Sequence, residues 1–415
     1  MIKKISLALV LGLLFTWSLP DVPALRYWLL FLSLLAVASQ ATWPEVKSVA
    51  KAHRRVLVLL FVFSAWLLGQ AAFISHDPWL AMKEIQSQWF NALLSLGLGI
   101  ILGCVARRQQ TMSGALVTTA LIAVWVAQAV IAVGQSVTHW WLHGELLRGL
   151  VPLTGGKLEM SFILNFLLSA LTVAVLFRAL YRRPFLRMPF AVLVLSLLIA
   201  LFSLYLAGAR NGVIGLLFLS TSAVLLYSIH QWRVSDWRRG MTSALLLLTL
   251  IIGIAAAGYR TDARWPAFVD SAHLGWAIDE HEAWKDINHA VWPLMENGQP
   301  AEASAYTRVA FIHAGLRLIR EFPLGVGYGR NAFSHALQQS GVVAQVGHAH
   351  SGWVDLGVGG GIPAVVLWLL FLGALIVTGA VRYFRDQDPH GLWLLFLATG
   401  FAGRMMVDSV NRDHM

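Results

Sequence analysis

Two histidines stand one residue apart late in the chain, in the stretch Gly347-His348-Ala349-His350-Ser351. A histidine side chain titrates near neutral pH, so it can take a proton from a hydroxyl group while that hydroxyl attacks an electrophile. His350 is therefore the first candidate catalytic residue, with His348 as its neighbour. A plain surface histidine in a histidine-rich loop is the simpler interpretation, and the sequence alone leaves both open.

The same pair of histidines could instead bind a metal ion, because side chains two residues apart can reach one ion. No carboxylate or third histidine stands at a spacing that would complete the site, and a structural zinc site uses four ligands. Cys104 is the only cysteine, so there is no disulfide framework and no cysteine-based metal site. The sequence predicts no bound metal and no cofactor.

Candidate anion-binding residues are arginines. Arg210 interrupts two apolar segments with almost no room for a loop, in Leu206-Ala207-Gly208-Ala209-Arg210-Asn211-Gly212. A guanidinium group there can bind a phosphate through two hydrogen bonds, or it can simply reach the membrane interface. Arg308 lies near the start of an amphipathic helix predicted over 304–322, and Arg264 would add to the same cationic surface.

A glycine-rich turn follows that predicted helix. Pro323 ends the helix, and Gly325 and Gly327 lie in a tight turn where backbone can approach a ligand such as an acceptor. The Gly-x-Gly-x-Gly spacing is weakly similar to a dinucleotide-binding fingerprint. That interpretation fails because the turn follows a helix rather than a strand.

The composition predicts the elements that must position these residues. Hydrophobic residues make up 58% of the chain and charged residues 13%, whereas soluble domains carry roughly 25% charged residues. Apolar runs of about 18 residues or more recur, and helices are the economical way to span lipid. We expect an all-α polytopic membrane protein with eleven or twelve transmembrane helices. The candidate spans are 5–20, 25–42, 55–75, 88–106, 113–134, 160–180, 188–207, 211–229, 241–258, 361–381 and 391–407.

These spans divide the chain into three parts. Residues 1–258 form an N-terminal transmembrane bundle, residues 259–351 a large and mainly helical loop, and residues 352–415 the C-terminal helices with a polar tail that contains Arg412. The loop holds seven of the fourteen histidines. It is therefore either the place of the chemistry or only a docking surface. A twelfth span beyond the tail stays open.

The distribution of basic residues predicts the orientation. One alternate set of short loops, which includes the N-terminus, holds 17 lysines and arginines, and the other set holds 5. This bias places the first set in the cytoplasm and the 259–351 loop on the outer side, which in a bacterium is the periplasm. The formal charge of +10 follows the same loops, so it specifies topology and does not indicate nucleic-acid binding.

Together these stretches resemble the O-antigen ligase and polymerase superfamily of bacterial envelopes. The resemblance covers the second half of the chain and is carried by the element around Arg210, the helix from Ser304 to Phe322 with its Pro-Leu and Gly-rich turn, His348 to Trp353, Gly361, and the tail from Asp408 to His414. Ser351 departs from the pattern, because the family has an asparagine there.

The resemblance implies a GT-C-like glycosyltransferase of the inner membrane with its active site facing the periplasm. Its donor would be an undecaprenyl-diphosphate-linked O-antigen and its acceptor the lipid A-core, without metal and with inversion. Carried over by position, Arg210 would bind the donor diphosphate with help from Arg308. His350 would activate or orient the acceptor hydroxyl, with His348 as its neighbour, and which of the two histidines is the base stays open. The polar tail with Arg412 leans towards the ligase branch.

Other functions stay open at this point. An O-antigen polymerase or a protein O-oligosaccharyltransferase would use the same donor with another acceptor. A transporter of the lipid-linked glycan would show charged residues within spans and broken helices in two matching halves. A pure assembly scaffold would explain the loop, but not Arg210 and His350 on one side of the membrane.

Overall fold

The structure, a computed structural model, describes residues 2–409 except 109–113, 148, 150–152, 155, 209, 235–236, 239, 243, 247, 250–263 and 290. Side chains are further left undescribed at 2–3, 210–211, 213, 233–234 and 264–266. In the described part the only extended pairing is an isolated antiparallel bridge between Leu294 and Pro300. The expectation of an all-α fold is confirmed.

Helices follow one another along the whole described chain. In sequence order they are α1 (Ile2–Thr16), α2 (Pro23–Ala38), α3 (Trp43–Ala52), α4 (Arg54–Phe73), α5 (Pro78–Glu84), the π-helical turn η1 (Ile85–Trp89), α6 (Phe90–Arg108), α7 (Gly114–His143), α8 (Lys157–Tyr181), α9 (Phe190–Ala207), α10 (Arg210–Val234), α12 (Arg264–Trp276), α13 (Ala303–Glu321), α14 (Ala332–Gln339), α15 (Gly352–Asp386) and α16 (Pro389–Arg404).

The helices support a polytopic membrane protein. Among the described residues, 7 helices are long and apolar enough to cross a membrane, or up to 8 if the bent pair α2 and α3 is one span. The shorter apolar helix within α1, Lys4–Thr16, and the 16-residue helix α16 lie at two more of the predicted spans. The predicted span 241–258 lies largely outside the described residues. The expected total of eleven or twelve spans therefore stays a prediction.

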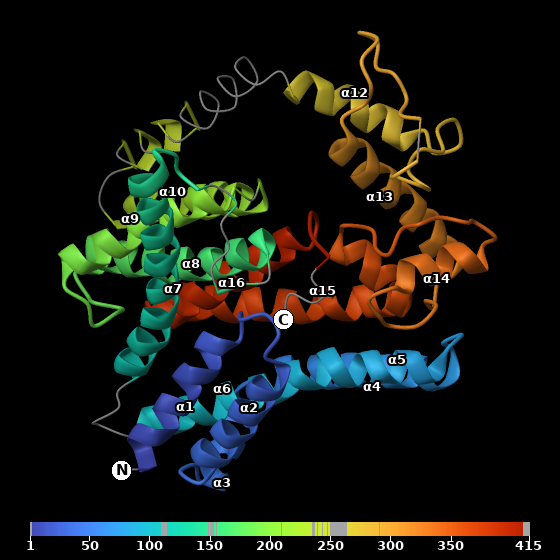
Figure 1. The fold of residues 1–415 in the computed structure, drawn as a ribbon. Coiled ribbons are helices and arrows are strands. Elements are labelled where there is room, and N and C mark those ends of the chain that lie inside the picture. The colour runs from blue at the N-terminus through green and yellow to red at the C-terminus, as the bar shows by residue number, and fades with distance from the viewer. Residues whose placement is uncertain are drawn as a thin grey trace.

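Helix α8 is the centre of the larger bundle. It packs against α7, α9, α10 and α16, and one side chain after another along it is fully buried, including Leu164, Leu167 and Leu171. Figure 1 shows α7 to α10 on one side of the molecule and α1 to α6 below them, with α15 and α16 lying across both groups. Close van der Waals packing between helices therefore holds the membrane part together.

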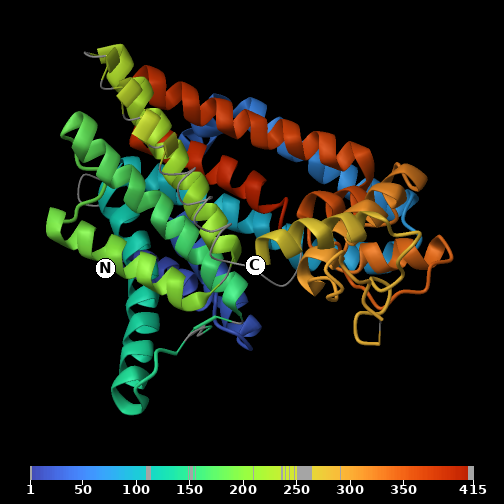
Figure 2. The same cartoon turned by 90° about the horizontal axis from the view of Figure 1, so that it is seen from above.

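The long loop folds into a second core at one end of α15. Figure 2 shows α12, α13 and α14 gathered there, away from the far end of the bundle. Tyr306, Phe311 and Phe333 are almost fully buried in this core. Gly315 lets α13 approach α15 closely, because a Cβ atom at this glycine would lie 2.1 Å from Cγ1 of Val354. The loop is thus fixed on the start of α15.

Helix α15 is broken at Gly361, whose φ of 77° is left-handed, with Pro363 just after the break. The carbonyl groups freed by the break accept hydrogen bonds from other parts of the chain. Gln70 Nε2 donates to the Gly359 carbonyl at 2.9 Å, and Trp66 Nε1 donates to the Gly360 carbonyl at 2.8 Å. An interrupted helix is tolerated at membrane depth when protein groups satisfy its backbone in this way.

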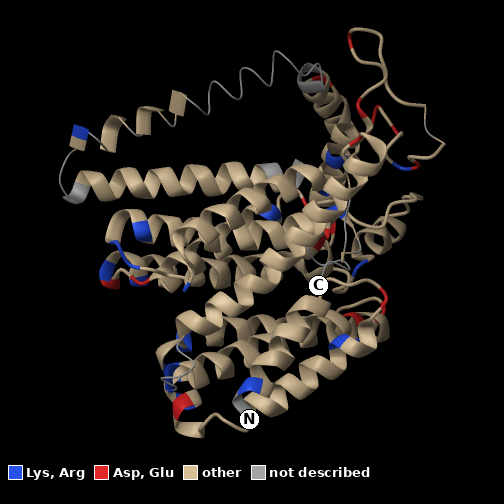
Figure 3. Cartoon of the chain, turned by 60° about the vertical axis from the view of Figure 1, so that its left-hand side comes forward, with Lys and Arg blue, Asp and Glu red and all other residues tan. Residues whose placement is uncertain are grey.

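Charged residues are distributed unevenly over the molecule. Figure 3 shows a group of lysine and arginine residues at the ends of the long helices away from the loop, while most acidic residues lie around the loop helices, together with several basic ones. This arrangement agrees with the distribution of basic residues along the sequence.

Candidate active site

The loop with the two histidines leads directly into α15. The helix begins at Gly352, two residues after His350, whereas the sequence predicts the next span only from residue 361. The reason for the difference is the break at Gly361, because a short helix, 352–360, precedes it and turns the chain. His350 therefore stands at the start of a helix and not in a free linker.

His350 has an unusual backbone conformation. Its φ of 54° lies in the left-handed region, which costs a residue other than glycine about 1 kcal/mol or more. Its ring stacks on Phe311 of α13 at a centroid distance of 5.9 Å and an interplanar angle of 12°. The His348 ring lies 4.1 Å from the His350 ring. The structure thus places the two histidine rings side by side, with His350 against α13.

The buried carboxylate of Asp355 holds the histidine loop. Its side chain lies on the first turn of α15, and the residue is 3% exposed. Oδ1 accepts a hydrogen bond of 2.8 Å from the Ala349 amide, and Oδ2 accepts one from the Ser409 hydroxyl. The sequence did not predict this role, because an acidic residue in the first turn of a helix is common and does not by itself indicate a site.

Residues 405–409, after α16, complete this clamp. The Ser351 hydroxyl donates to the Met405 carbonyl at 3.2 Å, and the Gly352 amide donates to the Asp408 carbonyl at 2.8 Å. Ser351, which stands where the family has asparagine, thus has a structural role here. The end of the described chain and the histidine loop form one hydrogen-bonded unit.

A buried ion pair lies beneath that unit. Arg404, 9% exposed, binds Asp408, 4% exposed, through Nη2 at 2.9 Å. The same nitrogen donates to the Leu158 carbonyl at 2.9 Å and to the Ser161 hydroxyl at 3.1 Å. Arg404 was missed at the sequence level, although an arginine inside a predicted span, 391–407, is a recognised sign of function.

Arg210 begins α10, directly after the left-handed Gly208 and residue 209. Its side chain lies outside the described part. Gly212, two residues further along α10, lies against Ser161 of α8, because a Cβ atom at this glycine would lie 3.2 Å from Cβ of Ser161. Since Ser161 accepts a hydrogen bond from Arg404, the first turn of α10 lies beside the buried ion pair. The backbone of Arg210 therefore starts on the same side as the histidine loop.

An apolar cavity of about 320 Å³ opens next to the ion pair, between α8, α10 and α16. Two polar atoms in residues that line it, Nη1 of Arg404 and Oδ1 of Asn165, are buried and have no hydrogen-bond partner in the described part of the chain. A buried polar atom without a hydrogen-bond partner destabilises the folded protein, so each of these atoms is a candidate for a hydrogen bond with a ligand. The cavity is suited to an apolar chain with a polar or anionic head.

The loop arginines are placed differently from one another. Arg317 makes a two-point ion pair with Asp279, with Nη1 at 2.6 Å from Oδ1, and this hydrogen bond lowers the pKa of that carboxyl. Arg308 is half-buried, has no ion pair among the described residues, and stands one helical turn before Phe311, which stacks on His350. Arg264 begins α12, but its side chain lies outside the described part, and so does all of Arg412.

The glycine turn supports the break in α15. The Val326 and Gly327 amides donate to the Val358 and Gly359 carbonyls, each at 3.0 Å. A Cβ atom at Gly325 would lie 2.4 Å from the Gly359 carbonyl oxygen. Gly325 and Gly327 were expected either to form a tight turn or to approach an acceptor. The contacts described here belong to the tight turn.

The predicted helix over 304–322 is present as α13, with a different start. Its N-cap is Glu302, whose side chain accepts a 2.7 Å hydrogen bond from the Ala305 amide. Burial raises the pKa of Tyr306 to about 12, so its hydroxyl stays protonated and donates to the His281 carbonyl at 2.9 Å. This bond ties α13 to the irregular part of the loop.

Comparison with known proteins gives a family match that covers most of the candidate site. A family model described as O-antigen ligase matches residues 195–369, which include Arg210, Arg308 and His350. No curated protein matches the chain. The match supports a function of O-antigen ligase or polymerase type, in a family of glycosyltransferase enzymes of the bacterial inner membrane.

Proposed function

We propose that this chain is an O-antigen ligase of the O-antigen ligase and polymerase superfamily, and the family match over residues 195–369 supports this proposal. The donor is an undecaprenyl-diphosphate-linked glycan and the acceptor a hydroxyl of the lipid A-core. The reaction takes place at the periplasmic face of the inner membrane. The bias of basic residues towards the opposite loops and the charge separation in Figure 3 support this orientation.

One observation carries the proposal. The first turn of α10, which starts at Arg210, and the loop of His350 are joined through a single buried unit, the Arg404–Asp408 pair. Ser161 links the pair to α10, and the Asp408 carbonyl links it to the start of α15. In this proposal, the diphosphate-binding Arg210 and the base His350 are thereby attached to the same buried ion pair.

The chemistry asked of these residues is a direct displacement. The acceptor oxygen attacks the anomeric carbon of the donor sugar, and the bond between that carbon and the diphosphate oxygen breaks. His350 takes the hydroxyl proton, and undecaprenyl diphosphate leaves with the electron pair of the broken bond. Attack from the face opposite the leaving group inverts the anomeric centre.

Arginine side chains stabilise the charge that develops on the leaving diphosphate. Arg210 contributes the main contact, and Arg308 and Arg264 assist from the loop. Arg404, whose buried Nη1 has no hydrogen-bond partner among the described residues, lines the apolar cavity that takes the first part of the polyprenyl chain. Because diphosphate is a good leaving group, charge stabilisation and one base are enough, without a metal ion. His348 packs against His350 and helps to orient its ring.

Glycan transfer in a purified system tests this function. The full chain, the lipid-diphosphate glycan and lipid A-core are combined with a chelator present, and transfer is measured for wild type, His350→Ala and Arg210→Ala. We expect transfer by wild type and a loss of about 100-fold or more in each variant, because a general base contributes about 10²–10⁴-fold.

Matched variants separate chemistry from folding. His289→Ala removes an exposed loop histidine that pairs with Asp286, and Arg320→Ala removes an exposed arginine at the end of α13. Both should keep wild-type transfer. Full activity in His350→Ala would remove its assignment as the base. Donor glycans lengthened by one another, or attached to protein, would identify a polymerase or a protein O-oligosaccharyltransferase instead.

A further inference from the structure

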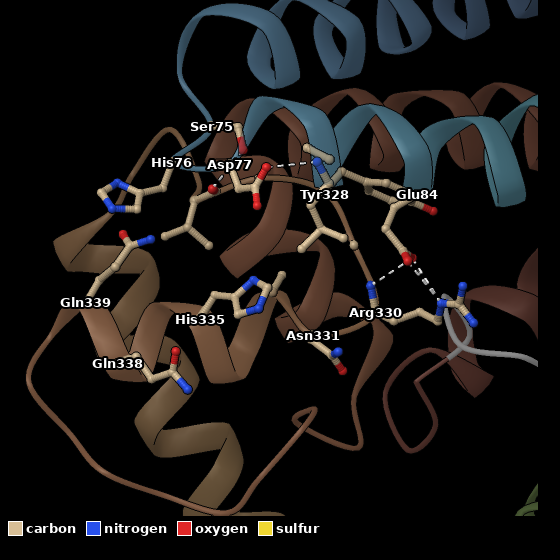
Figure 4. A pocket seen from close by; sticks show the side chains of 16 residues that line it. Ser75, His76, Asp77, Glu84, Tyr328, Arg330, Asn331, His335, Gln338 and Gln339 are labelled. Carbon is tan, nitrogen blue, oxygen red and sulfur yellow. Dashed lines mark hydrogen bonds and ion pairs between the residues drawn. The ribbon is translucent and has the colours of Figure 1, made fainter.

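A second, polar cavity of about 450 Å³ lies apart from Arg404, between two segments far apart in the sequence. One wall is formed by residues 75–84, at the turn from α4 into α5. The other is formed by residues 326–339, which comprise the glycine turn and α14. Figure 4 shows the ring of His335 between these walls, with Gln339 on the side of His76. The volume lies within the range of about 300–1,000 Å³ typical of small-molecule sites.

The floor of this cavity is rigid. Arg330 binds Glu84 through Nε at 3.0 Å, and the Arg330 amide donates to the same carboxylate at 3.3 Å. Tyr328 is buried and donates to Oε1 of Gln88 at 3.3 Å. The His76 amide donates to the Val326 carbonyl at 3.2 Å. The two walls are therefore fixed to each other before any ligand binds.

Five polar side chains line the cavity without a hydrogen-bond partner among the described residues: His76, Asn331, His335, Gln338 and Gln339. An amide offers both a donor and an acceptor, and a neutral imidazole offers one of each. A sugar ring presents hydroxyl groups that also donate and accept. The hydrogen-bond donors and acceptors of the cavity therefore match those of a polyhydroxylated ligand.

The charges in the cavity argue against two other ligand classes. The cavity's arginine, Arg330, is paired with Glu84, and Asp77 accepts a 2.9 Å hydrogen bond from the Leu80 amide as a helix cap. A phosphate would require unpaired cations, which this cavity does not offer among the described residues. An apolar chain would leave five amide and imidazole groups without partners. A neutral saccharide fits best.

The cavity adjoins the histidine loop through Asn331. Asn331 lines the cavity, and its Oδ1 would lie 3.7 Å from a Cβ atom at Gly347, the residue before His348. The apolar cavity is connected to the same loop less directly, because Arg404 lines it and pairs with Asp408, whose carbonyl accepts a hydrogen bond from the Gly352 amide. The histidine loop is thus linked to both cavities.

We propose that the cavity between α5 and α14 binds a neutral sugar unit of the acceptor and presents an acceptor hydroxyl towards His350. This assignment rests on the proposed function, because it assumes that two substrates meet at the histidine loop. It gives Asn331, His335 and Gln338 a role in acceptor recognition. The donor glycan is held elsewhere, on the side of Arg404.

Two measurements test the assignment. The first is binding of a defined probe, the core oligosaccharide released from lipid A and dephosphorylated, to the full chain in nanodiscs by saturation-transfer NMR. The second is the separate KM for acceptor and for donor in the transfer reaction. For His335→Ala/Gln338→Ala we expect the acceptor KM to rise about 25-fold, from about fivefold for each neutral hydrogen bond lost, with donor KM unchanged.

Gln345→Ala is the matched control, since this glutamine is exposed between α14 and the histidine loop and does not line the cavity. It should leave both KM values and probe binding unchanged. An unchanged acceptor KM in the double variant, or a rise in donor KM alone, would overturn the assignment. The NMR measurement needs no turnover, so wild type that binds the probe but transfers no glycan would count against the proposed ligase reaction and not against a sugar site.

Discussion

Asp355 and Ala349 are joined by a 2.8 Å hydrogen bond from the Ala349 amide to the buried carboxylate. Ala349 stands between the two candidate histidines, so this contact fixes both of them at once. The same carboxylate binds the Ser409 hydroxyl. One acidic side chain thereby links the histidine loop, the start of α15 and the segment after α16.

Replacing Asp355 by alanine should cost both stability and activity. The Ala349 amide and the Ser409 hydroxyl would be left buried without an acceptor, at about 1–3 kcal/mol for each group. Thermal unfolding in detergent and the transfer rate would measure the two effects. Asp355→Asn keeps an acceptor for Ala349, so it should recover most of both. Equal losses in the two variants would contradict this role.

The Arg404–Asp408 pair should show different effects on folding and on donor binding. Arg404→Leu removes the arginine from a buried ion pair and should destabilise the protein by about 3–5 kcal/mol, whereas Arg404→Leu/Asp408→Leu should unfold close to wild type. Chemical denaturation would measure the difference between them.

The stable double variant also tests the proposed contact of Arg404 with the donor. A hydrogen bond to a charged group contributes about 1.5–3 kcal/mol, so donor KM should rise by about 10- to 100-fold while acceptor KM is unchanged. A double variant with wild-type donor KM would limit Arg404 to a structural role.

The break in α15 predicts a strong difference between two glycines of one helix. Gly361 has a φ of 77°, and a Cβ atom there would lie 2.4 Å from the Leu324 carbonyl carbon. Gly361→Ala should destabilise the protein by more than about 1–2 kcal/mol, the cost of the left-handed conformation alone. Gly373→Ala is the control, since nothing lies within 4 Å of its Cβ position. Similar unfolding temperatures for both variants would show that the break is not fixed.

The turn between α15 and α16 predicts a pH effect on stability. Burial of Asp388 acts to raise its pKa, but the hydrogen bond with His390 and the charge of Arg382, whose Nε lies 2.8 Å from Oδ2, outweigh it and lower the pKa below 3.8. A depressed folded-state pKa means that the stabilisation is complete at neutral pH and is lost as the pH falls below that ordinary value.

Unfolding temperatures of wild type and Asp388→Asn, measured from pH 7 downward, would test this. We expect the variant to be less stable at pH 7 and the gap to be constant down to about pH 5. The gap should then close in stronger acid. A gap that already closes between pH 7 and pH 5 would exclude Asp388 as its source.

The sequence could predict the helical membrane fold, the long loop and the histidine pair, because these depend on apolar runs and on residues close together in the chain. It could not place Glu84 beside Arg330, since 246 positions separate them and only the packed helices bring them together. The break at Gly361 was also hidden, because an apolar run containing glycine is compatible with a continuous helix. Arg404 could have been predicted as a functional residue, because it is a charged residue within an apolar segment.

The clamp on the histidine loop also has a consequence for biogenesis. Residues 405–409, which hold Ser351, Gly352 and Asp355, leave the ribosome after every helix that they complete. A chain interrupted after α15 would already have most of its helices, but its histidine loop would lack the hydrogen bonds with residues 405–409. The histidine loop therefore reaches its final set of hydrogen bonds only after α16 and the segment that follows it have been made.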